Sequence, residues 1–145
     1  YRCAMENTRE RRVYIAIMVF LLISMTISNF LFDGRSLVFY LGYSLGTVLS
    51  SRVLLSSIFL YFLPRYRLVA SCCFSLVFAF EKIFFGSYYS DRAIHAEQIV
   101  YFFSEMFGYI FGVFFCLSIF DRIKVALKSI RSNEKSNPPI GKEES

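Results

Sequence analysis

Long runs of apolar residues, separated by short polar segments, dominate the chain. The runs cover residues 13–32, 37–63, 68–85 and 98–120. Each has about 18 residues or more, and a helix of that length crosses the roughly 30 Å hydrocarbon core of a bilayer. The pattern therefore predicts an all-α membrane protein in which four transmembrane helices, over residues 13–120, form an antiparallel bundle.

Polar residues and turn formers mark the ends of the runs. Residues 1–12 form a charged N-terminal segment, and residues 33–36, which include a glycine, predict a tight turn. Pro64 ends the second run, which is long enough either to tilt or to break near Ser50.

The C-terminal segment, residues 121–145, differs in composition from the rest of the chain. Residues 121–131 predict a short basic amphipathic helix, which would lie either against anionic lipid or free in the cytoplasm. Residues 132–145 carry mixed charge and two adjacent prolines, and we expect them to be disordered.

The basic residues predict the orientation of the spans. Cytoplasmic segments of membrane proteins carry an excess of lysine and arginine. With four spans, twelve basic residues lie on one side and only Arg35 and Arg92 on the other. The twelve are Arg2, Arg9, Arg11, Arg12, Arg65, Arg67, Arg122, Lys124, Lys128, Arg131, Lys135 and Lys142. We therefore expect both termini in the cytoplasm.

Composition supports the membrane interpretation. Of 145 residues, 56% are hydrophobic, and a soluble domain of this size has no core large enough to bury such runs. The formal charge of +5 is compatible with nucleic-acid binding, but the basic residues flank apolar segments. The expected partners are the lipid bilayer and another membrane protein or a second copy, with no nucleic acid. The expected location is a bacterial inner membrane.

Charged side chains interrupt the apolar runs at Arg52, Glu81, Lys82 and Glu105. A charge facing lipid costs a few kcal/mol, so these groups are expected to pair inside the bundle. If the helices are straight, Arg52 lies at a depth in the membrane similar to that of the carboxylates. We therefore expect an ion pair between Arg52 and Glu105, or failing that Glu81. Lys82 is expected to extend to the outer interface. The set is either a structural salt bridge or a site for ions, protons or a charged ligand.

Small residues recur at every fourth position on three of the predicted helices, and two of these sets contain glycines four residues apart. Gly42 and Gly46 share one face of the second span, and Gly108 and Gly112 share one face of the fourth. In lipid, small residues let helix backbones approach closely. These faces, with that of Ser71, Ser75 and Ala79 on the third span, are predicted helix-packing surfaces, within this chain or with a partner.

Candidate chemistry is sparse. Asp91, His95 and Glu97 have a spacing compatible with a metal site, but the chain has one histidine, and a polar loop with a helix cap is the favoured interpretation. No nucleophile motif, zinc-binding helix motif or phosphate loop is present. We therefore expect no enzymatic activity, no cofactor and no metal.

Size, span number and an intramembrane glutamate resemble the small multidrug transporters, and the size and span number are similar to those of membrane immunity proteins that guard against pore-forming toxins. In this chain the intramembrane carboxylates lie in the third and fourth spans, tryptophan is absent, and the chain is longer than those transporters. These differences mean that the resemblance does not assign the chain to a family. The sequence favours a non-enzymatic accessory, immunity-type or complex-subunit protein that acts through helix contacts. The alternative is a small transporter or channel component that uses the intramembrane Arg/Glu site.

Overall fold

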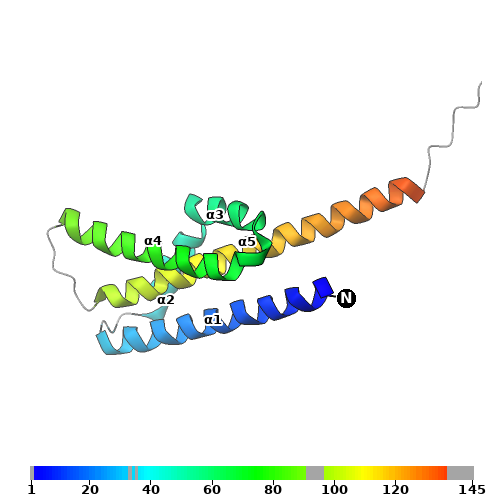
Figure 1. Ribbon diagram of the computed structural model, residues 1–145. Coiled ribbons are helices and arrows are strands. Elements are labelled where there is room, and N and C mark those ends of the chain that lie inside the picture. Colours follow the sequence, from blue (N-terminus) through cyan, green and yellow to red (C-terminus); the bar gives the residue numbers. More distant parts are fainter. Residues whose placement is uncertain (1, 33, 35, 91–96, 137–145) are drawn as a thin grey trace, which may run out of the picture.

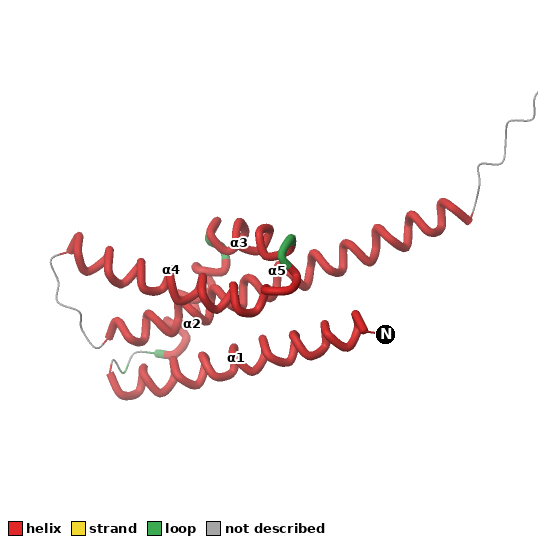
Figure 2. The backbone as a smooth tube through the Cα atoms, in the orientation of Figure 1, coloured by secondary structure: helices red, strands yellow, loops and turns green. Residues whose placement is uncertain are grey.

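The computed structural model describes residues 2–32, 34, 36–90 and 97–136, and these residues form helices joined by short connections. In chain order the elements are α1 (Arg2–Phe32), α2 (Leu37–Val48), α3 (Ser51–Tyr61), the 3-10 turn η1 (Pro64–Tyr66), α4 (Arg67–Ser90) and α5 (Glu97–Ser136) (Figures 1 and 2). The predicted all-α class is confirmed.

Helix α5 organises the bundle because the other four α-helices all pack against it. Helices α1 and α5 run in opposite directions, and α1 begins at the end of the bundle from which α5 projects (Figure 1). On α1, the buried residues Tyr14, Leu21 and Met25 recur at helical spacing and form one face. That face packs on the buried α5 residues Ile110 and Val113, among others.

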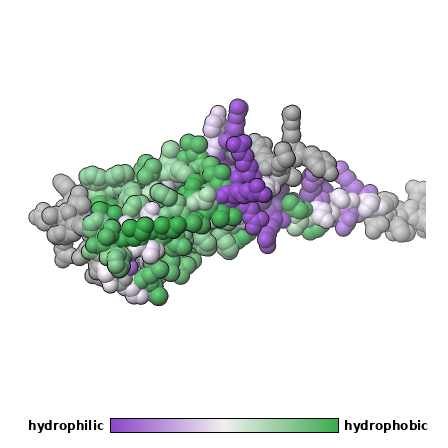
Figure 3. Space-filling model, turned by 90° about the horizontal axis from the view of Figure 1, so that it is seen from below, coloured by the Kyte–Doolittle hydropathy of each residue, from purple (hydrophilic) through white to green (hydrophobic). Residues whose placement is uncertain are grey.

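The outer surface of the bundle is apolar. Phe30 and Leu49 are each 86% exposed, and many other large hydrophobic side chains also face outward. Figure 3 shows apolar side chains over the helical body and a hydrophilic band at the end from which α5 projects. Apolar side chains exposed over so much of the surface are compatible with a protein that contacts lipid.

Two helical segments, Thr8–Phe32 and Pro64–Phe85, are long and apolar enough to cross a membrane. The pair α2 and α3 makes a third if the two helices together count as one bent span. Residues 98–120, the predicted fourth span, lie in α5, which is not among these segments. Most side chains of residues 98–120 are buried or half-buried, whereas residues 122–136 of the same helix are exposed. Four spans and the orientation of the termini therefore stay predictions.

The second apolar run, residues 37–63, breaks in the middle. Helix α2 ends at Val48, α3 begins at Ser51, and the two helices are bent by 56°. Ser50 has the extended conformation of an N-cap residue (φ −70°, ψ 146°), a position that serine favours. The alternative of a broken rather than tilted helix is the correct one.

Helices α1, α4 and α5 are longer than the apolar runs predict. Residues 121–131 are not a separate short helix, because α5 continues without a break to Ser136. Residues 132–136, expected to be disordered, are helical, and residues 137–145 lie outside the described part. Between residues 113 and 136 the sequence has no glycine or proline to end the helix. Residues 2–12 likewise belong to α1, and residues 86–90 of the predicted loop belong to α4.

Candidate functional site

The four charged residues of the apolar runs lie together in one groove beside the bend between α2 and α3. Arg52 is in the first turn of α3, Glu81 and Lys82 are on α4, and Glu105 is on α5. The groove has a volume of about 600 Å³. We call it the charged groove, and its remaining lining residues are Tyr43, Gly46, Thr47, Ser50 and Phe85.

Arg52 pairs with Glu81. Its Nη1 lies 3.2 Å from Oε2 and its Nη2 lies 3.3 Å from Oε1, which is a two-point contact. The guanidinium also lies 5.4 Å from the centre of the Phe78 ring. The favoured pairing of Arg52 with Glu105 is wrong, and the second choice, Glu81, is correct. The pairing with Glu105 assumes a straight helix through Arg52, whereas the bend brings the start of α3 beside α4.

Glu105 pairs instead with Lys82. The Lys82 Nζ lies 2.9 Å from Glu105 Oε2, and the Thr47 hydroxyl donates to the same oxygen at 3.0 Å. Lys82 also lies over the ring of Tyr43, 4.7 Å from its centre. Lys82 therefore lies in the charged groove, and its position at the outer interface stays a prediction. The Glu105 side chain is only 12% exposed, and a carboxylate buried to that degree requires a counter-charge.

The two ion pairs are open on one side. The side chains of Arg52 and Lys82 are 51% and 49% exposed, and that of Glu81 is 37% exposed. The prediction that Arg52 faces the bundle interior is thus wrong, because half of its side chain faces outward. Each charge has a partner, yet the groove presents polar atoms to whatever lies beside it.

The groove lies far from the basic end of the bundle. Arg67 on α4 and Asp121 on α5 form an ion pair at 3.8 Å and give a common reference level. Glu81 is about 14 residues beyond Arg67, and Glu105 is about 16 residues before Asp121, which correspond to about 21 and 24 Å of helix rise. Measured from that level, a hydrocarbon core about 30 Å thick would enclose the groove in its far third.

The four glycines divide into two pairs. A Cβ atom on Gly108 would lie 2.5 Å from the Ser44 carbonyl oxygen, and one on Gly112 would lie 2.7 Å from Val53 Cγ1. The Gly108 and Gly112 face is therefore a close contact with α2 and α3. At Gly42 and Gly46 an added Cβ meets nothing within 4 Å. In the part of the chain that the structure describes, Gly42 and Gly46 are not helix-packing residues, because their face of α2 points away from α5.

Some contributors to the site were not identified from the sequence. Thr47 and Tyr43 contact the charges, one through its hydroxyl and one through its ring. They lie one helical turn apart and before Arg52, a spacing that places them near the site. Which of them reaches Glu105 depends on the register between α2 and α5, about which a single sequence says nothing.

The alternative metal site at Asp91, His95 and Glu97 is not tested. Asp91 and His95 lie outside the described residues, and Glu97 begins α5. In the part of the chain that the structure describes, no group of three or more His, Cys, Asp or Glu side chains is placed to hold a metal ion.

No protein-family model, curated protein or solved structure matches this chain. The functional argument therefore rests on the geometry of the charged groove and of the surface around it.

Proposed function

We propose that the protein is a non-catalytic subunit of a membrane complex, and that its charged groove receives a membrane-spanning segment of a partner protein or of a second copy. One observation carries the proposal: the side chains of Arg52 and Lys82 are half exposed in their ion pairs. In the proposed topology this groove would lie within the hydrocarbon core, where lipid would cover it unless a protein did. The protein would act through helix contacts as an accessory, immunity-type or complex-subunit protein.

The free energy of burying charged groups favours contact of the charged groove with protein rather than with lipid. A single charged side chain at the centre of a spanning helix costs about 2.5–3.5 kcal/mol on insertion scales. Formation of an ion pair lowers that cost. However, donor and acceptor atoms of the pair that face hydrocarbon would still lack hydrogen-bond partners. A partner helix with hydroxyl, amide or charged side chains would supply acceptors and donors there.

The surface beside the groove suits close approach of a helix. Gly46 lines the groove, and Gly42 lies one turn away on the same face, with open space over both. Small residues that do not pack within the chain leave room for a second backbone. The small-residue face of α2 therefore lies next to the exposed ion pairs. Such a surface combines room for a second helix with polar groups that this helix could contact.

For the membrane topology we propose four spans with both termini cytoplasmic, in a bacterial inner membrane. The support is that Arg11, Arg67 and Arg122, from three segments far apart in sequence, line one cavity at one end of the bundle. In intact cells, a membrane-impermeant thiol reagent should label Ser90→Cys and should not label Ser136→Cys. Labelling of residue 136 from outside would contradict the orientation.

The complex can be tested by photo-crosslinking. Phe85 lines the groove, and its replacement by benzoylphenylalanine keeps an aromatic side chain there. Phe20 on α1 is 66% exposed and lies outside the groove, so the same replacement there is the matched control. After irradiation of native membranes, position 85 should give one discrete crosslinked product and position 20 none. Equal crosslinking at both positions, or none at position 85, would refute a specific partner.

The alternative, a small transporter or channel component, has its own support in the structure. Broken helices in transporters line polar sites near the bilayer midplane, and the bend between α2 and α3 adjoins the charged groove. This alternative requires water in the groove, whereas a protein interface keeps the groove dry. The two proposals therefore differ in the water accessibility of Gly46.

A further inference from the structure

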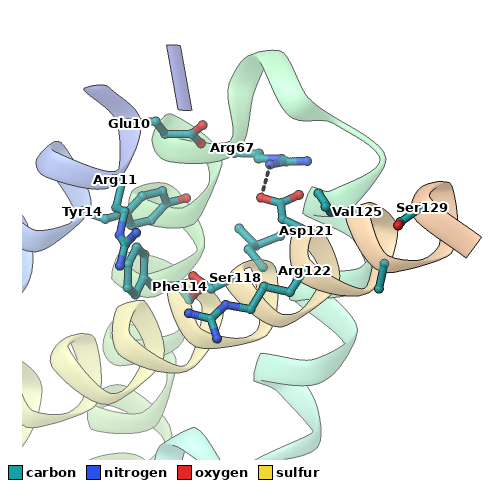
Figure 4. A pocket seen from close by; sticks show the side chains of 12 residues that line it. Glu10, Arg11, Tyr14, Arg67, Phe114, Ser118, Asp121, Arg122, Val125 and Ser129 are labelled. Atoms are coloured by element: carbon teal, nitrogen blue, oxygen red, sulfur yellow. Dashed lines mark hydrogen bonds and ion pairs between the residues drawn. The ribbon is translucent and has the colours of Figure 1, made fainter. Parts of the chain in front are cut away.

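A second charged cavity lies at the opposite end of the bundle from the charged groove. It has a volume of about 460 Å³ and lies between the start of α1, the start of α4 and the second half of α5 (Figure 4). That volume falls within the range of about 300–1,000 Å³ that is usual for ligand pockets. Arg11, Arg67 and Arg122 each line it, one from each helix, and we call it the arginine cavity.

The guanidinium groups of the arginine cavity have unused donors. Among the residues that the structure describes, neither Arg11 nor Arg122 forms an ion pair. The Arg67 Nε is buried and donates to no acceptor there. Arg67 Nη1 lies 3.8 Å from Asp121 Oδ2, too far for a hydrogen bond, and its Nη2 donates to the Tyr61 carbonyl at 3.4 Å.

The charge in the cavity is positive but small. Three arginines and two carboxylates, Glu10 and Asp121, line it, so the formal sum is +1. Figure 4 shows Asp121 beside Arg67, and Arg11 and Arg122 extending along the other side of the cavity. A net charge of +1 matches a singly charged anion such as a phosphodiester better than a multiply charged one.

One wall of the cavity is apolar. Phe114, Leu117, Val125 and Ala126 of α5 line it beside the arginines. Figure 3 shows that the hydrophilic band at this end borders the apolar surface of the bundle. The cavity therefore has a cationic part and an apolar part at the level where a lipid headgroup would lie.

We propose that the arginine cavity binds a phosphate group, supplied by the headgroup of an anionic phospholipid. The planar donor forks of Arg11 and Arg122 suit phosphate oxygens, and the Nε of Arg67 offers a further donor. The apolar wall would contact the glycerol and the first methylenes of an acyl chain. The proposal is independent of what the charged groove binds, since the two sites lie at opposite ends of the bundle.

Native mass spectrometry in detergent, with titration of phosphatidylglycerol or phosphatidylcholine, tests the proposal. The cavity variant is Arg11→Gln with Arg122→Gln. The matched control, Lys128→Gln with Arg131→Gln, removes the same charge from exposed positions of α5 that do not line the cavity. Phosphatidylglycerol should bind at least about tenfold more weakly to the cavity variant and within about twofold of normal to the control, as the loss of charge-assisted hydrogen bonds implies.

Two further measurements distinguish a lipid phosphate from a free phosphate ion and keep the test valid if the cavity variant misfolds. Ala126→Phe fills the apolar wall without changing charge and should also weaken phosphatidylglycerol binding. Millimolar inorganic phosphate should not compete; if it competes in full, the phosphate site stands but a free anion is its source. An equal loss in the cavity variant and its control, or equal binding of phosphatidylglycerol and phosphatidylcholine by the unaltered protein, would overturn the proposal.

Discussion

Replacement of Gly108 by leucine is expected to prevent stable packing of the helix bundle. A Cβ at this position would lie 2.5 Å from the Ser44 carbonyl oxygen and 2.9 Å from Thr47 Cβ. The first of these atoms belongs to a helix backbone and cannot rotate away, so α2 and α5 must separate. Overpacking of cores costs about 1–3 kcal/mol, and we expect this variant to exceed that range. Even alanine should destabilise the bundle.

Gly42→Leu is the matched control, since an added Cβ there meets nothing within 4 Å. In detergent-purified protein, the unfolding midpoint of Gly42→Leu should stay close to that of the unaltered chain, while Gly108→Leu should unfold at a much lower denaturant concentration or fail to purify. In native membranes, Gly42→Leu should instead weaken the proposed complex. Equal midpoints for Gly108→Leu and the unaltered protein would contradict the close α2 and α5 contact.

Loss of one partner of the Arg52 and Glu81 pair should destabilise the protein more than loss of both. Arg52→Leu leaves Glu81 without its counter-charge, and Glu81→Gln does the reverse. Each single change should cost about 1–3 kcal/mol, below the 3–5 kcal/mol of fully buried pairs, because both side chains are partly exposed. The double variant should recover part of the loss, with a coupling of about 0.5–3 kcal/mol in unfolding measurements.

Glu105 provides the control for this cycle. It pairs with Lys82 and not with Arg52, so Arg52→Leu and Glu105→Gln should be closer to additive. A larger coupling of Arg52 with Glu105 than with Glu81 would show that the ion pairs are exchanged in the membrane-embedded protein. Lys82→Leu should then couple to Glu81 instead.

Much of the fold follows from the apolar pattern. Apolar runs predict the helices because a bilayer leaves few other ways to satisfy backbone polar groups. The bend near Ser50 was open as an alternative, since serine both starts helices and interrupts a run that is longer than one span requires. The composition changes from apolar to basic at residue 121, and this change does not predict that α5 continues to Ser136. The helix continues because neither glycine nor proline interrupts it there.

The members of the site could be predicted, but their pairing could not. A charged side chain within an apolar run is conspicuous because its insertion into a bilayer costs free energy. This criterion identifies Arg52, Glu81, Lys82 and Glu105. Their partners depend on the rotation and bend of each helix, and a bend of 56° changes which carboxylate Arg52 reaches. The glycines show the same limit. Spacing reveals that Gly42 and Gly108 lie on small-residue faces, but not which of these two faces packs against a neighbouring helix of the chain.

The most direct test of the central claim is the reactivity of a thiol at position 46, in a chain whose own four cysteines are replaced by alanine. Gly46 lines the charged groove and has open space beside it. With a charged, water-soluble thiol reagent, Gly46→Cys should be unreactive in native membranes and should become reactive once detergent has removed the partner. Phe20→Cys on the exposed side of α1 should stay unreactive in both. Rapid reaction of Gly46→Cys in the native membrane would contradict the account, because it would show a hydrated groove and favour transport.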